Sequence, residues 1–312
     1  MKQSLQHLHQ EFMNECQYAS KLSPETLRGY QAGFDLLIKL MPNIEMTTIC
    51  SKMIIEFFRR LEHRERVVGK GQVKKGVKKT TIATYRSKLN KFFDWLARKG
   101  HLGTNPFREM EYPAVSYEDR KFLKKEDVEK IFTAVGFTID WQSQLVRKRN
   151  FALMHALLYC GLRRGECMNL KMLDIDFQRK QLTVRAETSK SKRERVIPLN
   201  SKILLALHDY AEERKKYTTP YFFVSNNKDD KLTYDGLKHL VEKIVHASGV
   251  KFHVHQLRHT FAVNLLNNGC DIAKLKQLMG HTDIRMTMAY LRCIPTKAMR
   301  ADIEVLSLDT LL

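Results

Sequence analysis

The amino-acid sequence predicts a mainly α-helical chain with one small antiparallel β-sheet, divided into two domains. Across most of the chain, apolar residues recur three and four positions apart, as they do on one face of a helix. Two short segments, 181–185 and 194–199, alternate apolar and polar residues as strands do. Residues 107–121 are polar, contain a proline and show no period, which indicates a domain boundary. We expect a first domain over 1–110, a linker over 111–121 and a second domain over 122–312.

The first domain is expected to be a bundle of four helices. Ser23 precedes Pro24, and a serine cap followed by proline at the first helical position is a typical helix start. Gly100 follows a long amphipathic segment and indicates where that helix ends. The four expected helices cover 1–22, 24–41, 48–62 and 81–99.

Residues 64–80 interrupt the helical pattern with a basic, glycine-containing segment. It holds seven basic residues, one acidic residue and three glycines. Its simplest interpretation is a solvated, mobile loop, but in so basic a chain we favour a loop that contacts phosphates. The residues expected to contact DNA are Lys70, Lys74, Lys75, Lys78, Lys79, Arg86 and Lys192.

The charge of the chain indicates a polyanionic partner. Lys and Arg number 54 against 34 Asp and Glu, which gives a formal net charge of +20 and a pI near 9.7. An excess of this size, spread along the chain, favours nucleic acid as the partner. No apolar run of 18 residues and no signal-peptide core occurs, and the six cysteines form no CxxC pair. We therefore expect a cytoplasmic, nucleoid-associated protein with reduced thiols and no membrane contact.

The second domain is expected to be mostly helical, with the small sheet inside it. Between its two strands lies the basic sequence ETSKSKR, which should form the tip of a hairpin. A short apolar run over 221–224 follows later. Helices are expected just after 122–127, over 149–160, after 166, over 201–216 and over 234–248.

The segment 255–290 concentrates unusual polar residues. His255 and Arg258 are three positions apart and therefore share a helix face. On one unbroken helix, the spacing of His281 and Tyr290 would place them on opposite faces. Gly280 indicates a helix end, so His281 becomes a junction residue that can turn back toward Tyr290.

Three helices should build this segment. Two of them pack together and are joined by a turn at 267–269, which reads Asn-Asn-Gly. The third begins after Gly280, with Thr282 or Asp283 as its cap, and carries Tyr290.

The polar residues suit phosphoryl transfer. Two arginines, Arg163 and Arg258, offer paired donors to phosphate oxygens, where charge accumulates in the transition state. Tyr290 can attack the phosphorus but must lose its proton, because a free tyrosine has a pKa of about 10. His255 can accept that proton or hold the phosphate, and His281 can hydrogen-bond the same phosphate.

The departing hydroxyl needs a proton, and a lysine at the hairpin tip could supply it. Lys190 and Lys192 are both candidates for this role. No carboxylate cluster or Cys/His ligand set indicates a metal, and we expect no cofactor.

Each of these residues also has a simpler structural explanation. Arg163 could cap a helix, and Arg164 is an equal candidate by chemistry alone. A hairpin lysine is usually solvated, the two histidines could be structural, and Tyr290 could be a half-buried aromatic residue. The joint pattern, and not any single residue, favours catalysis.

Four motifs of the second domain resemble those of the tyrosine recombinases, the family of phage-integrase and Xer-like site-specific recombinases. They are GLRRGE at 161–166, SKRERVIPL at 191–199, HQLRHTF at 255–261 and LMGHTDIRMTMAY at 278–290. In the first domain, SPETLRGYQAGF and TIATYRSKLNKFFDWLARKGHLGTNPF resemble the first and last helices of the family's core-binding domain. The basic segment at 64–79 is longer than in the plainest members, and we expect the simple Xer-like architecture without an arm-binding domain.

The resemblance assigns roles by position. It makes Arg163, not Arg164, the first arginine of the phosphate clamp, and Glu166 its acidic support. It makes Tyr290 the nucleophile. The other implied catalytic residues are Lys190, His255, Arg258 and His281, and Lys192 stays open as the alternative general acid.

The resemblance also implies a fold and a reaction. The fold would be a helical SAM-like core-binding domain plus a mixed α/β catalytic domain, which together form a C-shaped clamp on double-stranded DNA. Tyr290 would form a 3′-phosphotyrosyl intermediate, and strands would exchange through a Holliday junction without ATP. The active form would be a homotetramer on two sites, joined by exchange of a C-terminal helix at about 297–312, with possible accessory proteins.

Three other functions remain compatible with the sequence. A type IB topoisomerase-like enzyme would use the same tyrosine chemistry to relax DNA without exchanging partners. A non-catalytic DNA-binding protein would keep the fold but should lack a catalytic residue, and all are present. A metal-dependent nuclease would lose activity in EDTA. Whether the role is integration, excision, inversion or dimer resolution is left open by the sequence.

Overall fold

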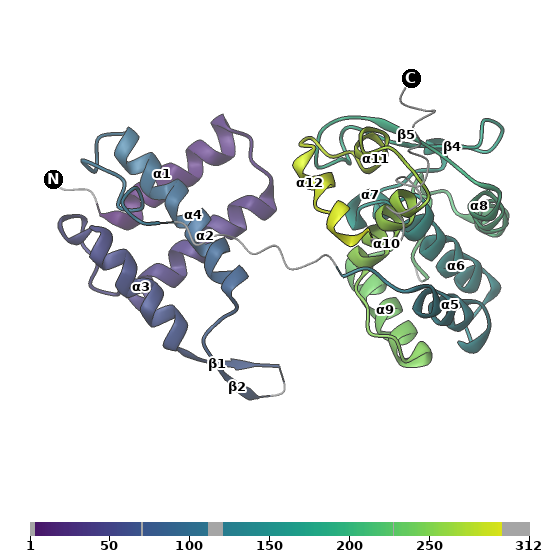
Figure 1. Cartoon of the computed structure of the whole chain (residues 1–312), viewed down its shortest axis with the longest axis horizontal. Helices are drawn as coiled ribbons and strands as arrows, with labels where there is room; N and C mark the ends of the chain where they lie inside the picture. Colours follow the sequence, from purple (N-terminus) through teal and green to yellow (C-terminus); the bar gives the residue numbers. More distant parts are fainter. Residues whose placement is uncertain (1–3, 70, 112–120, 227, 295–312) are drawn as a thin grey trace, which may run out of the picture. The chain divides into compact units, whose positions relative to one another are not determined.

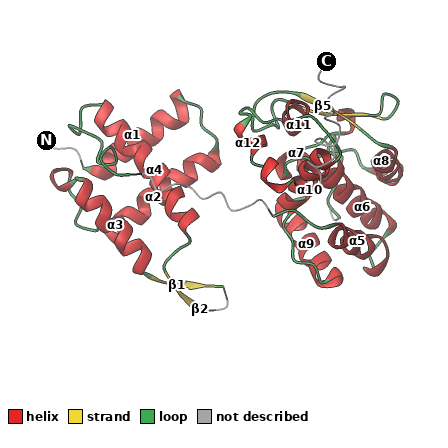
Figure 2. Cartoon of the chain, in the orientation of Figure 1, coloured by secondary structure: helices red, strands yellow, loops and turns green. Residues whose placement is uncertain are grey.

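The computed structural model of the chain describes residues 4–69, 71–111, 121–226 and 228–294 (Figure 1). Contacts between Cα atoms divide the chain into two compact units, Met1–Ser116 and Tyr117–Leu312. Both are built mainly from helices, with short antiparallel strands (Figure 2), so the predicted fold class is confirmed. In the described part of the chain, no helix is long and apolar enough to cross a membrane.

The first unit packs its helices around an aromatic core. The Ser23 hydroxyl accepts a hydrogen bond from the Thr26 backbone N–H at 3.3 Å, and Pro24 opens the helix, as predicted. Phe57 and Phe93 are fully buried where the helices meet. The elements are α1 (Leu5–Asn14), the π-helix η1 (Glu15–Ala19), α2 (Pro24–Leu40), the 3-10 helix η2 (Met46–Thr48), α3 (Ser51–His63), β1 (Glu65–Val68), β2 (Gln72–Lys75) and α4 (Lys79–Arg98).

The basic segment 64–80 is not a loop, and the first unit is not all-helical. Residues 65–68 and 72–75 pair as an antiparallel hairpin, drawn as the two arrows β1 and β2 in Figure 2. The β-branched residues Val67 and Val73 favour strands, and Gly71 adopts φ +73° in the turn. Lys70 lies outside the described residues.

Arg86 does not fit its predicted role in DNA contact. It lies on α4, but only 9% of its surface is exposed. Its guanidinium donates hydrogen bonds to the backbone carbonyls of Met110 at 3.1 Å and Glu111 at 2.8 Å. Arg86 therefore links residues 110–111, at the end of the described part of the first unit, to α4. The described lysines of the expected contact set, at 74, 75, 78, 79 and 192, are all exposed.

The second unit combines helices with one three-stranded sheet. The two predicted strands pair as expected, and a third, two-residue strand extends the sheet in the order β3-β4-β5, all antiparallel. The elements are α5 (Lys125–Thr133), η3 (Ala134–Thr138), α6 (Gln144–Tyr159), α7 (Arg164–Met168), η4 (Met172–Asp174), β3 (Ile175–Asp176), β4 (Gln181–Val184), β5 (Arg195–Pro198), α8 (Ser201–Glu213), η5 (Arg214–Lys216), α9 (Tyr234–Ser248), α10 (Val254–Asn267), α11 (Ile272–Met279), α12 (Arg285–Met288) and η6 (Leu291–Cys293).

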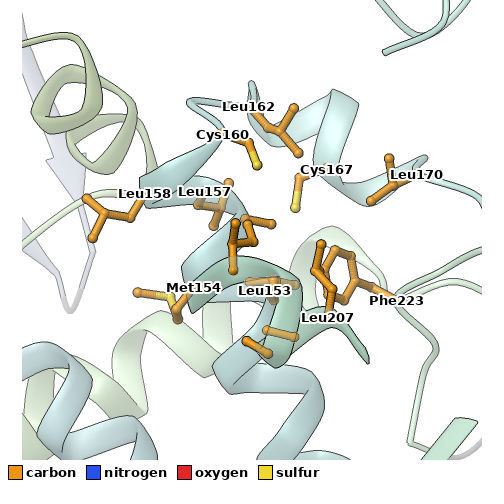
Figure 3. Close-up of a cluster of buried hydrophobic side chains, with 14 of the residues drawn as sticks. Leu153, Met154, Leu157, Leu158, Cys160, Leu162, Cys167, Leu170, Leu207 and Phe223 are labelled. Carbon is orange, nitrogen blue, oxygen red and sulfur yellow. The ribbon is translucent and has the colours of Figure 1, made fainter. Parts of the chain in front are cut away.

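Helix α6 forms the centre of the second unit. Its Leu153 and Leu157 are fully buried and lie among side chains from α8 and the segment around Phe223 (Figure 3). Cys160 and Cys167 belong to the same cluster, and burial raises the pKa of the Cys160 thiol to about 12. Five of the cysteines, at 16, 50, 160, 167 and 270, are free thiols, as predicted, and Cys50 among them is exposed. This core fixes α6, and with it the loop that carries Arg163.

Candidate active site

A left-handed glycine turns the chain at the end of α11, as predicted. Gly280 has φ +62° and caps that helix. The helix begins at Asp271, whose carboxylate accepts hydrogen bonds from the backbone N–H groups of Ala273 and Lys274 at 2.8 and 3.1 Å. His281 follows the glycine directly and is buried. The turn thus brings His281 inward, as the sequence predicted.

Tyr290 lies just beyond helix α12, although the sequence predicted that this helix would carry it. Helix α12 ends at Met288, and its cap is Ile284, not Thr282 or Asp283. The backbone N–H of Tyr290 bonds to the Thr287 carbonyl at 2.9 Å, which is the spacing of a tighter 3-10 turn. The ring is 1% exposed and packs in an apolar cluster with Phe261 and Met279. Packing of the ring in this cluster, and not helix propensity, therefore fixes where the tyrosine points.

The hydroxyl of Tyr290 meets a histidine for which the sequence pattern predicted no role. Its Oη lies 2.8 Å from Nδ1 of His259. The exposed His255 is stacked edge-on against His259, with ring centroids 4.4 Å apart. The three rings therefore form a row from solvent to the buried hydroxyl. The signal was present in HQLRHTF, where His259 follows His255 by one helical turn.

Arg258 is buried and binds the backbone on two sides. It donates to the carbonyls of Gly161 and Met279, and its Nη2 lies 3.2 Å from Nε2 of His281. Burial lowers the pKa of Arg258 to about 9, and the positive charge of Arg163 acts in the same direction. Arg258 therefore keeps its charge at neutral pH.

The contacts of His281 define its tautomer. An arginine can only donate, so Nε2 of His281 accepts from Arg258. Its Nδ1 lies 2.9 Å from the hydroxyl oxygen of Thr287, which is fully buried. A neutral His281 therefore carries its proton on Nδ1 and donates it to Thr287. The ring also lies parallel to that of Tyr290, with centroids 6.4 Å apart.

Glu166 joins two arginines in the interior. Arg163 donates from its backbone N–H and from Nη1 to the carboxylate, both at 2.8 Å, and from Nη2 to the Gly280 carbonyl at 3.0 Å. Arg195 donates to both carboxylate oxygens, at 3.0 and 2.7 Å. Burial alone would raise the pKa of Glu166, but the bonds from Arg195 and Arg163 outweigh it and hold the pKa at about 2. The carboxylate is therefore ionised.

Arg195 is a second residue that the sequence pattern did not single out. It lies at the start of β5, and its side chain is 7% exposed. Its Nε also donates to the Leu278 carbonyl at 2.8 Å. The motif SKRERVIPL contains it, but the sequence does not show which of its three basic residues points inward. Arg164, in contrast, stacks over the ring of Tyr234 at 4.6 Å, which separates it from Arg163.

The cluster carries excess positive charge. Among the described side chains it holds three guanidinium groups, of Arg163, Arg195 and Arg258, against the one carboxylate of Glu166. A cleft of about 750 Å³ lies beside it, lined by His281, Gly280 and basic side chains of β5 and α11. A partly buried site with a net charge of +2 stabilises a bound anion, since low dielectric strengthens the attraction.

The two candidate general acids stay outside this cluster. Lys190 and Lys192 lie on the segment between β4 and β5, and both are exposed. Lys192 adopts φ +51°. The structure thus brings five of the predicted site residues together: Arg163, Glu166, Arg258, His281 and Tyr290. His255 and both lysines are exposed to solvent. No group of three or more His, Cys, Asp or Glu side chains that could hold a metal ion occurs in the parts of the chain that are described.

Comparisons with known proteins give matches to both units of the chain. Residues 121–295 match the phage integrase family, and residues 10–100 match the phage integrase N-terminal SAM-like domain. The chain is 28% identical over 290 residues to tyrosine recombinase XerC of Oceanobacillus iheyensis, an alignment that covers 89% of each chain. It is 31% identical over 225 residues to tyrosine recombinase XerD of Listeria innocua, covering 70% of this chain and 73% of the relative.

Solved structures share the fold. The Tn1549 transposon integrase in complex with transposon right end DNA has a TM-score of 0.75 at 20% identity, covering 96% of this chain and 99% of that one. The XerH site-specific recombinase bound to palindromic difH substrate has a TM-score of 0.72 at 19% identity, covering 94% and 82%. The SAM-like first domain expected from the sequence is confirmed by the family match and this likeness.

Proposed function

This chain belongs to the phage integrase family of tyrosine recombinases, and from that premise we propose that it is a site-specific DNA recombinase. It cuts and rejoins double-stranded DNA. The observation that carries this proposal is the buried cluster in which Arg163 and Arg258 contact the same turn, one at the Gly280 carbonyl and the other at Met279. Both guanidiniums thus converge on the turn that carries His281, whose ring lies parallel to that of Tyr290.

The cluster is suited to a phosphodiester in its transition state. Two fixed guanidiniums can face the non-bridging oxygens, where negative charge increases during attack. Glu166 holds Arg163 in place but neutralises only part of the positive charge. The remaining charge is available to the phosphate, and no cofactor is needed in this scheme.

The proposed cleavage step conserves bonds and protons. Tyr290 Oη forms a bond to phosphorus, and the bond from phosphorus to the 5′ oxygen breaks. The tyrosine proton passes to a histidine, and the 5′ oxygen takes a proton from Lys190 or Lys192. A 3′-phosphotyrosyl link and a free 5′-hydroxyl result. Attack by a 5′-hydroxyl from the partner duplex reverses the step and leads to a Holliday junction.

His259 is a second candidate, besides His255, for the group that accepts the proton of Tyr290. It already lies at hydrogen-bond distance from the hydroxyl, whereas His255 lies one ring further out. Because Tyr290 is buried in the described state, it must move outward to reach a phosphate. We propose that this movement occurs when DNA occupies the arginine cluster.

The assembly is proposed from the family. We expect a homotetramer on two recombination sites, formed by exchange of the C-terminal helix at about 297–312, which lies outside the described residues. We also expect the protein to act in the cytoplasm on the nucleoid, with accessory proteins in some reactions. The separate domains proposed are 1–110 and 122–312, joined by 111–121.

A covalent trap tests the proposed chemistry. A randomised library of nicked duplexes is incubated in EDTA with the wild type, with Tyr290→Phe, and with Tyr234→Phe as a matched control for an exposed tyrosine of the same unit. After denaturation in SDS, DNA still attached to protein is sequenced. We expect the wild type and Tyr234→Phe to retain DNA, and Tyr290→Phe to retain none.

The same material separates recombination from its alternatives. Retention by Tyr290→Phe would refute the assigned nucleophile, and retention by no protein would favour a DNA-binding protein. Cleavage of the duplexes only when Mg²⁺ replaces EDTA, with no DNA left attached to the protein, would favour a metal-dependent nuclease. Two duplexes of different length that carry the enriched sequence should yield recombinant products, whereas a topoisomerase-like enzyme would yield only relaxed plasmid.

A further inference from the structure

The hairpin β1–β2 exposes an apolar pair at its centre. Val67 and Val73 lie directly opposite each other across the two strands. Their exposed fractions are 74% and 62%, which are among the largest of the apolar side chains described. Cross-strand packing between two valines stabilises a hairpin but covers only their facing sides. The outer surface of the pair is therefore left for a partner.

The hairpin is a projecting ribbon with little support of its own. All four residues of β2 are exposed, and β1 alternates between exposed and half-buried positions. A two-stranded ribbon is marginally stable alone in water. A partner that covers its faces would stabilise it.

Hydrogen bonds close the base of the ribbon beside the end of α3. The Gly76 N–H donates to the Arg64 carbonyl at 2.8 Å, and Nε of Arg66 donates to the Gly76 carbonyl at 2.8 Å. Gly76 has φ +68°, and a Cβ there would lie 2.5 Å from the Glu62 carbonyl oxygen. Only glycine fits this close approach. The ribbon therefore projects in a fixed direction from the end of α3.

The charge around the valine pair indicates the chemistry of the partner. In the described part of 64–79, basic side chains outnumber acidic ones by six to one. Because side chains alternate along a strand, Glu65 and Lys75 flank the valines on their face, while Arg66 and Lys74 point to the other. The valine face thus carries one acidic and one basic flank, and the opposite face carries two basic ones. An apolar centre on a ribbon with this excess of basic side chains is complementary to a groove with phosphates along its edges.

We propose that the β1–β2 ribbon enters the major groove of the DNA duplex, where Val67 and Val73 contact the C5-methyl groups of thymines. The inference rests on the proposed function, because it takes double-stranded DNA as the substrate. The major groove, about 12 Å wide, admits a two-stranded ribbon, and the thymine methyl is the apolar group displayed there. The ribbon then contributes to recognition of the recombination site, with its lysines on the flanking phosphates.

Uracil tests this assignment, since it pairs like thymine but lacks the C5-methyl group. Duplexes are selected from a randomised pool by the full-length wild type, and the selected sequence is prepared in thymine and uracil forms. Dissociation constants for both forms are measured for the wild type, Val67→Ser/Val73→Ser, Val67→Thr/Val73→Thr and Ile55→Ser. Ile55 is an exposed apolar residue on α3 and serves as the control outside the ribbon.

The expected result is a coupling between the valines and the methyl groups. The wild type and Ile55→Ser should bind the uracil form more weakly, by about fourfold for each methyl group contacted. The serine pair should bind both forms equally. The threonine pair keeps the β-branch that favours a strand and one methyl group per residue. The ratio of its dissociation constants for the uracil and thymine forms should therefore be intermediate.

Three outcomes would overturn the inference. One is a wild type that binds both forms equally, and a second is a serine pair that discriminates as strongly as the wild type. In both cases the covalent complex with Tyr290 still forms, so the proposed function stands. A wild type that selects no duplex and forms no covalent complex would overturn the proposed function and the inference together.

Discussion

Glu166 is the residue on which the positions of the buried arginines depend. It binds Arg163 and Arg195 directly and lies 3.9 Å from Arg258. Its side chain is 1% exposed, so its charge interacts with theirs in a medium of low dielectric. Removing one member of a buried charge network leaves the others uncompensated, which costs about 3–5 kcal/mol.

The ionisation of Glu166 should appear in the pH dependence of stability. Its pKa is about 2 in the folded chain and 4.5 when unperturbed. The unfolded chain therefore binds the proton more readily between these values, and stability falls as pH drops through that window. The shift corresponds to about 3 kcal/mol, present above pH 4.5 and lost by pH 2.

Urea unfolding of Glu166→Gln, measured across that window, tests this contribution. The variant should be less stable than the wild type at pH 7, and the difference should shrink as pH falls from 4.5 toward 2. Glu129→Gln, which alters an exposed glutamate, should show no such trend. A difference in unfolding free energy between Glu166→Gln and the wild type that does not change with pH would contradict the proposed charge network.

The rate of cleavage can distinguish the two candidate proton acceptors, His259 and His255. Glutamine can hydrogen-bond but cannot take a proton, so replacing the true proton acceptor should slow formation of the covalent complex by about 10²- to 10⁴-fold. We expect His259→Gln to show this loss and to flatten the pH profile of cleavage. His239→Gln, an exposed control, should be neutral. If His255→Gln alone flattens the profile, His259 only positions the tyrosine.

At the scale of elements, the turn at Gly280 connects the candidate catalytic residues. It ends α11, its carbonyl binds Arg163, and it places His281 beside Arg258. A Cβ at Gly280 would lie 2.8 Å from Nη1 of Arg195. The turn therefore needs glycine for its backbone and for the space that the arginine occupies.

Gly280→Ala should separate these two requirements when compared with Gly249→Ala. Gly249 also caps a helix with positive φ, but a Cβ there meets nothing within 4 Å. Both variants should lose about 1–2 kcal/mol of stability, because alanine is strained in that conformation. Only Gly280→Ala should also lose covalent complex formation. Equal activity in the two variants would show that Arg195 adjusts without consequence.

The hairpin should make a measurable electrostatic contribution to DNA binding. Removing a lysine from one phosphate of a duplex reduces the salt slope of binding by about 0.9. Lys74→Gln/Lys75→Gln should therefore lower the slope of log Kd against log salt concentration by about 2. The control is Lys125→Gln/Lys130→Gln on α5, which should leave it unchanged. An unaltered slope in the hairpin variant would place these lysines away from phosphates.

At the scale of the whole molecule, each of the two units has an apolar core of its own. Phe107 is buried in the first unit, and Leu157 is buried in the second. Because each unit has its own core, each should unfold as a cooperative element of its own.

Calorimetry of the full chain should resolve two transitions that respond to different variants. Phe107→Ala should lower the temperature of only one transition, and Leu157→Ala only that of the other. Truncating a buried side chain of this kind costs about 2–5 kcal/mol of stability. A single transition shifted equally by both variants would mean that the units unfold together.

Local sequence signals predicted most elements well. The start of α2 at Pro24, the bounds of α9 and the glycine turn at 280 follow from caps, helical period and backbone freedom, all of which act within a few residues. The pattern at 64–80 was misinterpreted as a loop because lysines and glycines masked two four-residue strands. Only pairing between the strands, which involves residues up to ten positions apart, stabilises them.

The sequence by itself therefore determined the mainly helical class, and it predicted the two-domain plan and the phosphate chemistry proposed for Arg163, Arg258 and Tyr290. Only the tertiary structure decided which neighbours join them. It turned Arg195 inward from β5, brought His259 to the tyrosine hydroxyl and buried Arg86 away from its predicted role. The physical reason is that composition and period fix local backbone shape, whereas the direction of a side chain depends on packing between segments far apart in the chain.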